Sequence, residues 1–203
     1  MRSVLLASNN PGKIRELRAL LAPAQARLLT PADLLLDLKL VEDGQDYAAN
    51  ASLKALGFAR AANMLAVGDD SGLEVEALDG APGLYSARAA GPAATDADRR
   101  RMLLERLAPL PPPWPARFVC AMALASPEGT IAIAHGVCRG QIGRQERGDS
   151  GFGYDPIFIV EDSGMTMAEL PEERKNQISH RARAAQALLP RLLAALQAQS
   201  AQR

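Results

Sequence analysis

The adjacent carboxylates of Asp69 and Asp70 are the most direct indication of chemistry in this sequence. They follow the apolar run 65–67, which is suited to a buried strand, and they precede Ser71 and Gly72. Two neighbouring carboxylates repel each other and gain most from a shared cation. Mg²⁺ is commonly held by one or two carboxylates together with the phosphates of a substrate. We therefore predict a magnesium site here. A tight turn is the alternative, because Asp, Ser and Gly are all common in turns.

A second segment, Ser8-Asn9-Asn10-Pro11-Gly12-Lys13, has the composition of a phosphate-binding helix start. It follows the apolar run 4–7, Asn10 fits an N-cap, and Pro11 fits the first helical position. Backbone N–H groups at a helix N-terminus bind phosphate, and the ammonium of Lys13 adds a positive charge. The GxxxxGK[ST] spacing of a Walker A loop is absent, and an N-cap turn with an exposed lysine is the alternative.

Two further charged positions could support such a site. Glu42, in Glu42-Asp43-Gly44, could supply another metal ligand, although a solvated acidic turn is the alternative. Lys54 lies four residues after Asn50 in the Ala-rich segment 46–63, which we expect to be a helix. Residues spaced by four share one helix face, so these two side chains are predicted to be neighbours.

Two segments in the last third of the chain suit recognition of a planar base. Gly151-Phe152-Gly153-Tyr154-Asp155-Pro156 places two aromatic rings among glycines, and a base can stack on such rings. The alternative is a structural turn with both rings in the core. Lys175 precedes Ser179-His180-Arg181, where basic residues oppose the dipole of the final helix and suggest an anionic or hydrogen-bonding partner. Solvated side chains, and a packing role for His180, are the alternative.

The elements that must position these residues are predicted to form an α/β fold with a mixed sheet. We expect strands at 4–7, 65–67, 73–77 and 157–160, and a hairpin of 118–125 and 131–137. Thr95 and Asp98 resemble a capping box that opens a helix to about Leu107. A last helix after Ser179 is interrupted by Pro190. The stretch 109–115 contains four prolines and predicts a stiff connection between two halves of the chain.

Composition excludes several classes of protein. The chain has 203 residues, 23 Lys+Arg against 23 Asp+Glu, and 48% hydrophobic residues. The balanced charge argues against a protein that binds nucleic acid or an anionic membrane surface, and no apolar stretch is long enough to span a membrane. Cys120 and Cys138 lack metal-site spacing and are expected to be buried thiols rather than a disulfide. We expect a cytoplasmic protein.

Four motifs in order, SNxxGK, DDSGLxVxxLxGxPGxYSAR, GFGYDPxF and SHR, resemble those of the inosine/xanthosine triphosphate pyrophosphatases. The resemblance runs from about Val4 to Leu196. It implies a single domain over residues 1–203 in an elongated α/β fold, with two lobes flanking a deep nucleotide-binding cleft, and a homodimer. It also implies Mg²⁺-dependent hydrolysis of ITP, dITP and XTP to the monophosphate and pyrophosphate. A related pyrophosphatase for another modified nucleotide, or a non-catalytic nucleotide-binding protein, is the alternative.

The resemblance also implies roles for individual residues. Asp70 matches the general base, and Asp70, Glu42 and Asp69 are the candidate metal ligands. The residues that match substrate contacts are Ser8, Asn9, Asn10, Pro11, Gly12, Lys13, Lys54, Ser71, Phe152, Gly153, Tyr154, Asp155, Lys175, His180 and Arg181. The family's Glu-Asn-Ala before the lysine reads Ala49-Asn50-Ala51 here, so one carboxylate near Lys54 is missing.

Overall fold

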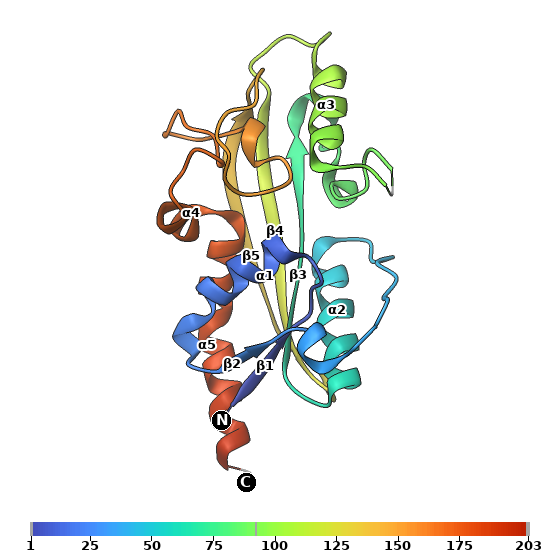
Figure 1. The fold of residues 1–203 in the computed structure, drawn as a ribbon, viewed down its shortest axis with the longest axis vertical. Coiled ribbons are helices and arrows are strands. Elements are labelled where there is room, and N and C mark those ends of the chain that lie inside the picture. Colours follow the sequence, from blue (N-terminus) through green and yellow to red (C-terminus); the bar gives the residue numbers. More distant parts are fainter. Residues whose placement is uncertain (1, 92, 202–203) are drawn as a thin grey trace. The chain divides into compact units, whose positions relative to one another are not determined.

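Six strands form one mixed sheet in the order β2-β1-β3-β4-β5-β6 (Figure 1). The structure is a computed structural model that describes residues 2–91 and 93–201. β1 is parallel to β2 and to β3, whereas β5 and β6 are antiparallel. The strands are β1 (Ser3–Leu6), β2 (Arg27–Leu29), β3 (Ala66–Val75), β4 (Pro115–Ser126), β5 (Gly129–Ile142) and β6 (Phe158–Val160). The predicted α/β class with a mixed sheet is confirmed.

Five α-helices accompany the sheet in the described part of the chain. They are α1 (Pro11–Leu20), α2 (Tyr47–Ala62), α3 (Asp96–Leu107), α4 (Glu172–Ile178) and α5 (His180–Ala201). Asn10 caps α1 and accepts a hydrogen bond from the Lys13 amide, and the capping box of Thr95 and Asp98 opens α3, both as predicted. α5 continues through Pro190 as one helix. No helix in the described ranges is long and apolar enough to cross a membrane.

The chain divides into two compact units. Unit 1 comprises the residues up to Asp70, Cys120–Gly136 and the residues from Arg181 onward, and unit 2 comprises Ser71–Val119 and Val137–His180. β3, β4 and β5 each contribute residues to both units. The proline-rich stretch 109–115 joins α3 to β4, and its residues belong to unit 2, so it does not connect the two units.

Unit 1 has one apolar core on each face of its strands. On one face, Val4 and Leu6 of β1 pack with side chains of α1 and α5 such as Leu17 and Leu188. On the other face, Leu5 packs with alanines and Phe58 of α2. The alternation follows from strand geometry, because successive side chains point to opposite faces. Figure 1 shows α1 and α5 on one side of β1 and α2 on the other.

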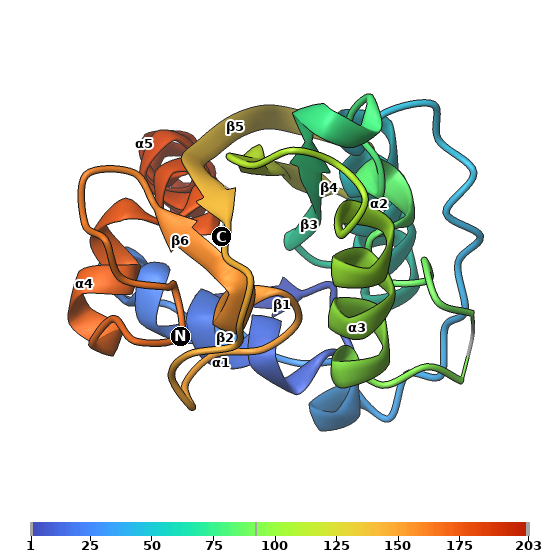
Figure 2. The same cartoon turned by 90° about the horizontal axis from the view of Figure 1, so that it is seen from above.

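Unit 2 has a core of its own, into which α3 packs. Leu103 and Leu107 of α3 join Leu73, Trp114 and Ile157 in this core. The loop that precedes β6 lies beside α3 (Figure 2), and two hydrogen bonds between α3 side chains and the Gly153 backbone connect them. Cys138 is buried in this core and Cys120 in a core of unit 1, and the two are thiols rather than a disulfide, as predicted.

The predicted break near Asp70 is wrong. β3 runs without interruption from Ala66 to Val75, so the Asp-Asp-Ser-Gly segment lies within a strand and not in a turn between two strands. Gly68 supports this arrangement, because a Cβ there would lie 2.8 Å from the Ala55 backbone nitrogen of α2. The strand therefore passes close to α2 just before the two aspartates, where side chains alternate between its faces.

Candidate active site

Asp69 lies at the centre of a buried charge cluster in unit 1. Its Oδ2 accepts a hydrogen bond from Nε of Arg181 at 3.1 Å and pairs with Nζ of Lys13 at 3.0 Å. Arg181 also pairs with Glu16 of α1. Burial by itself would raise the pKa of Asp69, but the positive charges of Lys13, Arg181 and Lys54 outweigh burial and hold that pKa well below its usual range. Asp69 is therefore ionised at neutral pH, and its carboxylate positions Lys13.

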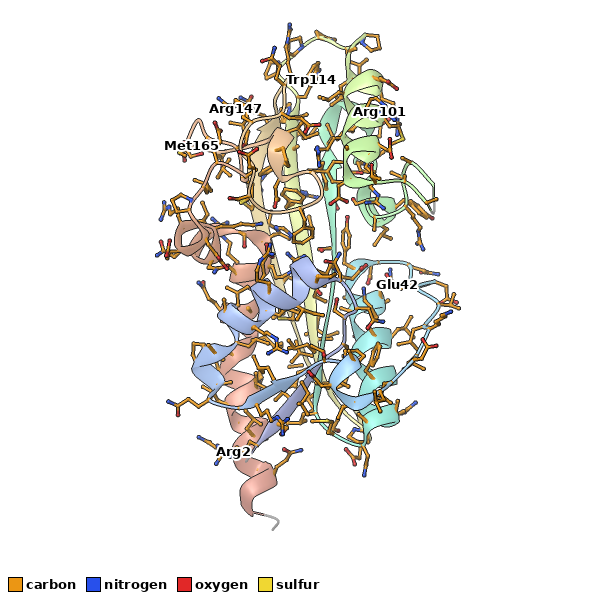
Figure 3. The ribbon with its side chains drawn as sticks, in the orientation of Figure 1. Arg2, Glu42, Arg101, Trp114, Arg147 and Met165 are labelled. Carbon is orange, nitrogen blue, oxygen red and sulfur yellow. The ribbon has the colours of Figure 1, made fainter. Side chains whose placement is uncertain are left out.

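Asp70 contacts a different set of side chains, all from α2. Its Oδ1 is 3.0 Å from Nζ of Lys54, and its Oδ2 accepts a hydrogen bond from Nδ2 of Asn50 at 3.1 Å. Lys54 Nζ also lies 3.3 Å from Oε2 of Glu42, in the segment before α2 (Figure 3). One ammonium group thus holds two of the carboxylates that the sequence singled out.

Lys54 stays charged in this position. Burial lowers its pKa, but the carboxylates of Asp70, Asp69 and Glu42 outweigh burial and raise the pKa above its ordinary value. Asn50 links the same carboxylate to the acidic segment, because its Oδ1 accepts a hydrogen bond from the Gly44 amide at 2.8 Å. The predicted proximity of Asn50 and Lys54 on one helix face is confirmed by their shared contact with Asp70.

The structure brings together two of the three predicted metal ligands, and the third points elsewhere. Glu42 and Asp70 meet at Lys54, whereas Asp69 contacts α1 and α5 on the other face of β3. In residues 2–91 and 93–201, no three His, Cys, Asp or Glu side chains form a group suited to a metal ion. Two converging carboxylates fit a cation whose remaining ligands come from phosphate and water.

The predicted phosphate-binding segment lies at the start of α1. Ser8 accepts a hydrogen bond from the Asn10 amide at 3.2 Å, and Asn9, Asn10 and Pro11 are exposed. The carboxylate of Asp69 anchors Lys13, the last residue of this segment. The segment therefore presents the polar N-terminus of α1 next to a fixed ammonium group, which suits an anion.

The predicted base-binding segment forms a tight loop in unit 2. Oδ2 of Asp155 accepts a hydrogen bond from the Phe152 amide at 3.0 Å and pairs with Nζ of Lys175 at 2.7 Å. The same Nζ lies 5.4 Å from the centre of the Phe152 ring. Gly151 is required here, since its φ is +80° and a Cβ would collide with Oδ2 of Asp155.

Tyr154 and His180 are packed differently from what base stacking needs. Tyr154 is 4% exposed and belongs to the core of unit 2, and its hydroxyl donates a hydrogen bond to the Ser86 carbonyl. The structural alternative is therefore correct for this ring, whereas Phe152 is only half-buried. His180 is 5% exposed and stacks on Phe118 with ring centres 4.7 Å apart. Ser71 follows Asp70 in β3 and is half-buried.

Sequence reasoning missed three residues that hold the site together. Glu16 is a charged residue of α1, and a charged residue in a helix is normally expected to face solvent. Nothing in its position in the sequence indicates that it is buried and paired with Arg181. Asp96 and Arg100 of α3 bind the Gly153 backbone, 57 and 53 residues away in the sequence. The only sequence signal for this contact was an acidic residue, Asp96, at the first position of α3. An acidic residue there is equally explained by its favourable interaction with the helix dipole.

Comparisons with known proteins identify the family of this chain. Residues 4–191 match the model of the Ham1 family. A "dITP/XTP pyrophosphatase" of Thermus thermophilus is 48% identical over 187 residues, covering 92% of this chain and 89% of the relative. One of Nostoc sp. is 45% identical over 195 residues, covering 95% of each chain.

Solved structures of proteins from the same family have a similar fold. A HAM1 protein from Coxiella burnetii superimposes with a TM-score of 0.84 at 39% identity, covering 94% of this chain and 98% of that one. The Staphylococcus aureus Ham1 protein has a TM-score of 0.80 at 37% identity, covering 98% and 100%. The buried ion pairs of Asp69 and Asp70 thus lie within a fold shared with these proteins, and the chain belongs to the Ham1 family.

Proposed function

We propose that this protein hydrolyses the deaminated purine nucleotides ITP, dITP and XTP to the nucleoside monophosphate and pyrophosphate. Relatives named dITP/XTP pyrophosphatase that are 45–48% identical over most of the chain support this substrate class. The structural observation that carries the proposal is the ammonium of Lys54 between Glu42 and Asp70. Paired carboxylates beside a fixed lysine are suited to phosphoryl chemistry, in which catalysis depends on positioning and charge stabilisation.

The triphosphate binds to the start of α1 and to two lysines in this proposal. Ser8, Asn9, Asn10, Pro11 and Gly12 present the helix N-terminus, whose N–H groups and dipole favour phosphate oxygens. Lys13 and Lys54 add fixed positive charges, because carboxylates hold both ammonium groups in place. Ser71 contacts the substrate next to Asp70.

Mg²⁺ binds to Glu42 and Asp70 in this proposal. Both carboxylates lie within 3.3 Å of Nζ of Lys54, which places them side by side, and carboxylate oxygens are the hard ligands that Mg²⁺ prefers. When bound, Mg²⁺ would neutralise charge that develops on the leaving pyrophosphate. We assign Asp69 a supporting role, because its carboxylate faces Lys13 and Arg181.

Asp70 acts as the general base. It accepts a proton from the water molecule that attacks the α-phosphorus, while the bond from the α-phosphorus to the bridging oxygen breaks and pyrophosphate leaves. Lys54 and Asn50 fix the orientation of this carboxylate through one contact to each oxygen. Such fixed geometry is the main contribution that a protein makes to phosphoryl transfer.

The nucleoside is recognised by the segment 152–155 and by three basic side chains. The backbone of Phe152, Gly153, Tyr154 and Asp155 lines the nucleoside, and Lys175, His180 and Arg181 select the base. Hypoxanthine and xanthine carry an oxygen at C6 where adenine carries an amino group. Lys and Arg can only donate hydrogen bonds, so the N–H groups of Lys175 and Arg181 that their carboxylate partners do not engage favour the C6 oxygen and are left unsatisfied opposite adenine.

A product assay tests this function. ITP, dITP, XTP, ATP and GTP are incubated with Mg²⁺ or with EDTA, and pyrophosphate is separated from orthophosphate. We expect pyrophosphate from the first three substrates only, and none in EDTA. Orthophosphate would place the attack at the γ-phosphorus and remove Asp70 from its role. Nucleotide binding without any product would support a binding protein instead.

We also propose that the protein acts as a homodimer in the cytoplasm, where its nucleotide substrates are found. The balanced charge, with 23 basic and 23 acidic residues, favours neither a nucleic acid nor a membrane surface as an additional partner. Light scattering coupled to gel filtration checks the dimer, and a monomeric mass with full activity would refute it. Fractionation of cells that produce the protein checks the compartment.

A further inference from the structure

Gly153 is held at both polar atoms of its backbone by side chains of α3. Its amide donates a hydrogen bond to Oδ2 of Asp96 at 2.7 Å, and its carbonyl accepts one from Nη1 of Arg100 at 2.8 Å. The residue has a φ of +63°, and a Cβ at this position would meet no atom within 4 Å. Space is therefore available here, so packing does not hold this backbone, and the two hydrogen bonds fix the peptide groups on either side of Gly153.

The two side chains of α3 are themselves held in place. Asp96 pairs with Arg99 at 2.5 Å, and Arg100 pairs with Glu146 at 2.9 Å. The Nε atoms of Arg99 and Arg100 are buried and have no hydrogen-bond partner in the part of the chain that the structure describes. A buried donor without a partner destabilises the folded state. The burial of these two arginines is therefore maintained by the other contacts that α3 makes with the loop around Gly153.

Movement of Gly153 would reach the neighbouring side chains directly. Phe152 precedes it, and the Phe152 amide is bound by Asp155, which also holds Lys175. The Lys175 ammonium in turn lies 5.4 Å from the Phe152 ring. A rotation of the Gly153 peptide therefore changes the placement of a half-buried ring and of the hydrogen bond that supports the lysine contact.

We propose that Asp96 and Arg100 are positioning residues that set the nucleoside selectivity of this protein by fixing the Gly153 peptide. Neither residue is among the groups to which we assign a substrate contact. The inference rests on the proposed function, because it assumes that Phe152, Gly153 and Lys175 bind the nucleoside. The inference goes beyond that function, because it makes nucleoside selectivity depend partly on α3, a helix to which we assign no contact with the base.

The test compares Asp96→Ala and Arg100→Ala with two controls from the same helix. Arg101→Ala removes an exposed arginine (Figure 3) whose ion pair is with Asp98, and Asp98→Ala removes the capping box without touching Gly153. Hydrogen exchange of the Gly153 amide and kinetics on ITP and ATP are measured for each variant. We expect faster exchange in Asp96→Ala and normal exchange in both controls.

The kinetic result separates positioning from general stability. We expect KM for ITP to rise about tenfold in Asp96→Ala and Arg100→Ala with little change in kcat, which is the pattern for loss of uniform binding. The ratio of kcat/KM for ITP over ATP should fall about fivefold, since a looser site discriminates less. The controls should keep the wild-type ratio even where their thermal stability is lowered.

Conservative variants cover the case in which an alanine variant does not fold. Asp96→Asn retains an oxygen that can accept from the Gly153 amide, and Arg100→Lys retains one donor, so both should recover most of the selectivity. Faster exchange at Gly153 with an unchanged ITP/ATP ratio would overturn the inference while the proposed function stands. A wild-type protein without activity on any of the five nucleotides would remove the proposed function itself, and this role with it.

Discussion

Asp69 and Asp70 are consecutive in β3, but their carboxylates lie on opposite faces of the strand. Asp69 pairs with Lys13 of α1 and Arg181 of α5, whereas Asp70 pairs with Lys54 of α2. The two carboxylates therefore have different partners and different roles, although the residues are adjacent in the sequence. One neutralises a buried cluster of positive charge, and the other is held in an orientation suited to catalysis.

Asp70→Asn should abolish most turnover while leaving nucleotide binding intact. The amide cannot accept a proton at neutral pH, and loss of a general base typically lowers kcat by about 10²–10⁴-fold. Asp43→Asn serves as a matched control, because its carboxylate lies in the same acidic segment as Glu42 and has no assigned role. Turnover is measured on ITP, and binding of ITP by calorimetry without Mg²⁺. Near-normal turnover in the Asp70→Asn variant would exclude Asp70 as the general base.

Arg181→Ala should destabilise the protein strongly. The guanidinium is 2% exposed and serves both Asp69 and Glu16, so its removal leaves two buried carboxylates without this partner. Loss of one partner of a buried ion pair costs about 3–5 kcal/mol. Arg18→Ala is the control, since its pair with Asp33 is exposed and worth ~0–1 kcal/mol. Urea unfolding measures both, and equal midpoints would contradict this account.

Acid should destabilise the protein partly through Asp69. The folded-state pKa of Asp69 lies well below its usual range, because Lys13 and Arg181 outweigh the effect of burial. A depressed pKa contributes stability that is complete above the unfolded value of about 4 and is lost as pH falls through the folded value. We expect the free energy of unfolding to decline below about pH 5, and to decline less steeply in Asp69→Asn. An identical slope in both proteins would assign the acid sensitivity to other carboxyls.

The Cys120 thiol should resist alkylation in the folded protein. Burial raises the pKa of Cys120 to about 12, so almost no thiolate exists at pH 8. Iodoacetamide should modify neither cysteine in the native state, since Cys138 is buried as well, and both after unfolding in urea. Mass spectrometry of peptides after alkylation checks each site. Rapid modification of native Cys120 would show that this part of the core opens easily.

Gly44→Ala should impair catalysis through the Asn50 contact. A Cβ on Gly44 would lie 2.6 Å from Oδ1 of Asn50 and 2.8 Å from Cβ of Ala49, so the segment carrying Glu42 must shift. We expect kcat/KM to fall about tenfold or more, as small displacements in a phosphoryl-transfer site are costly. Gly129→Ala is the control, because no atom lies within 4 Å of its Cβ position. Wild-type kinetics in Gly44→Ala would show that the segment has no role in positioning.

The sequence determined the elements whose signals are local. Asn10 and Pro11 specify the start of α1, and the Thr95–Asp98 capping box specifies the start of α3, because these signals operate between residues a few positions apart. Asn50 and Lys54 share a helix face for the same reason, and their common contact with Asp70 follows once α2 packs on β3. The ordered motifs also sufficed to indicate the family.

Only the tertiary structure decided which charges meet. The segment of Asp, Ser and Gly has the composition of a turn. In the structure, however, β3 pairs with β1 at Ala66 and Val67, packs against α2 at Gly68 and continues as an extended strand through both aspartates. The alternation of the strand then separates them. No periodic pattern in the sequence indicates the contact of Arg181 with Glu16, 165 residues away, or the contact of Asp96 with Gly153. Long-range contacts of this kind arise when packing brings together side chains that local patterns cannot relate.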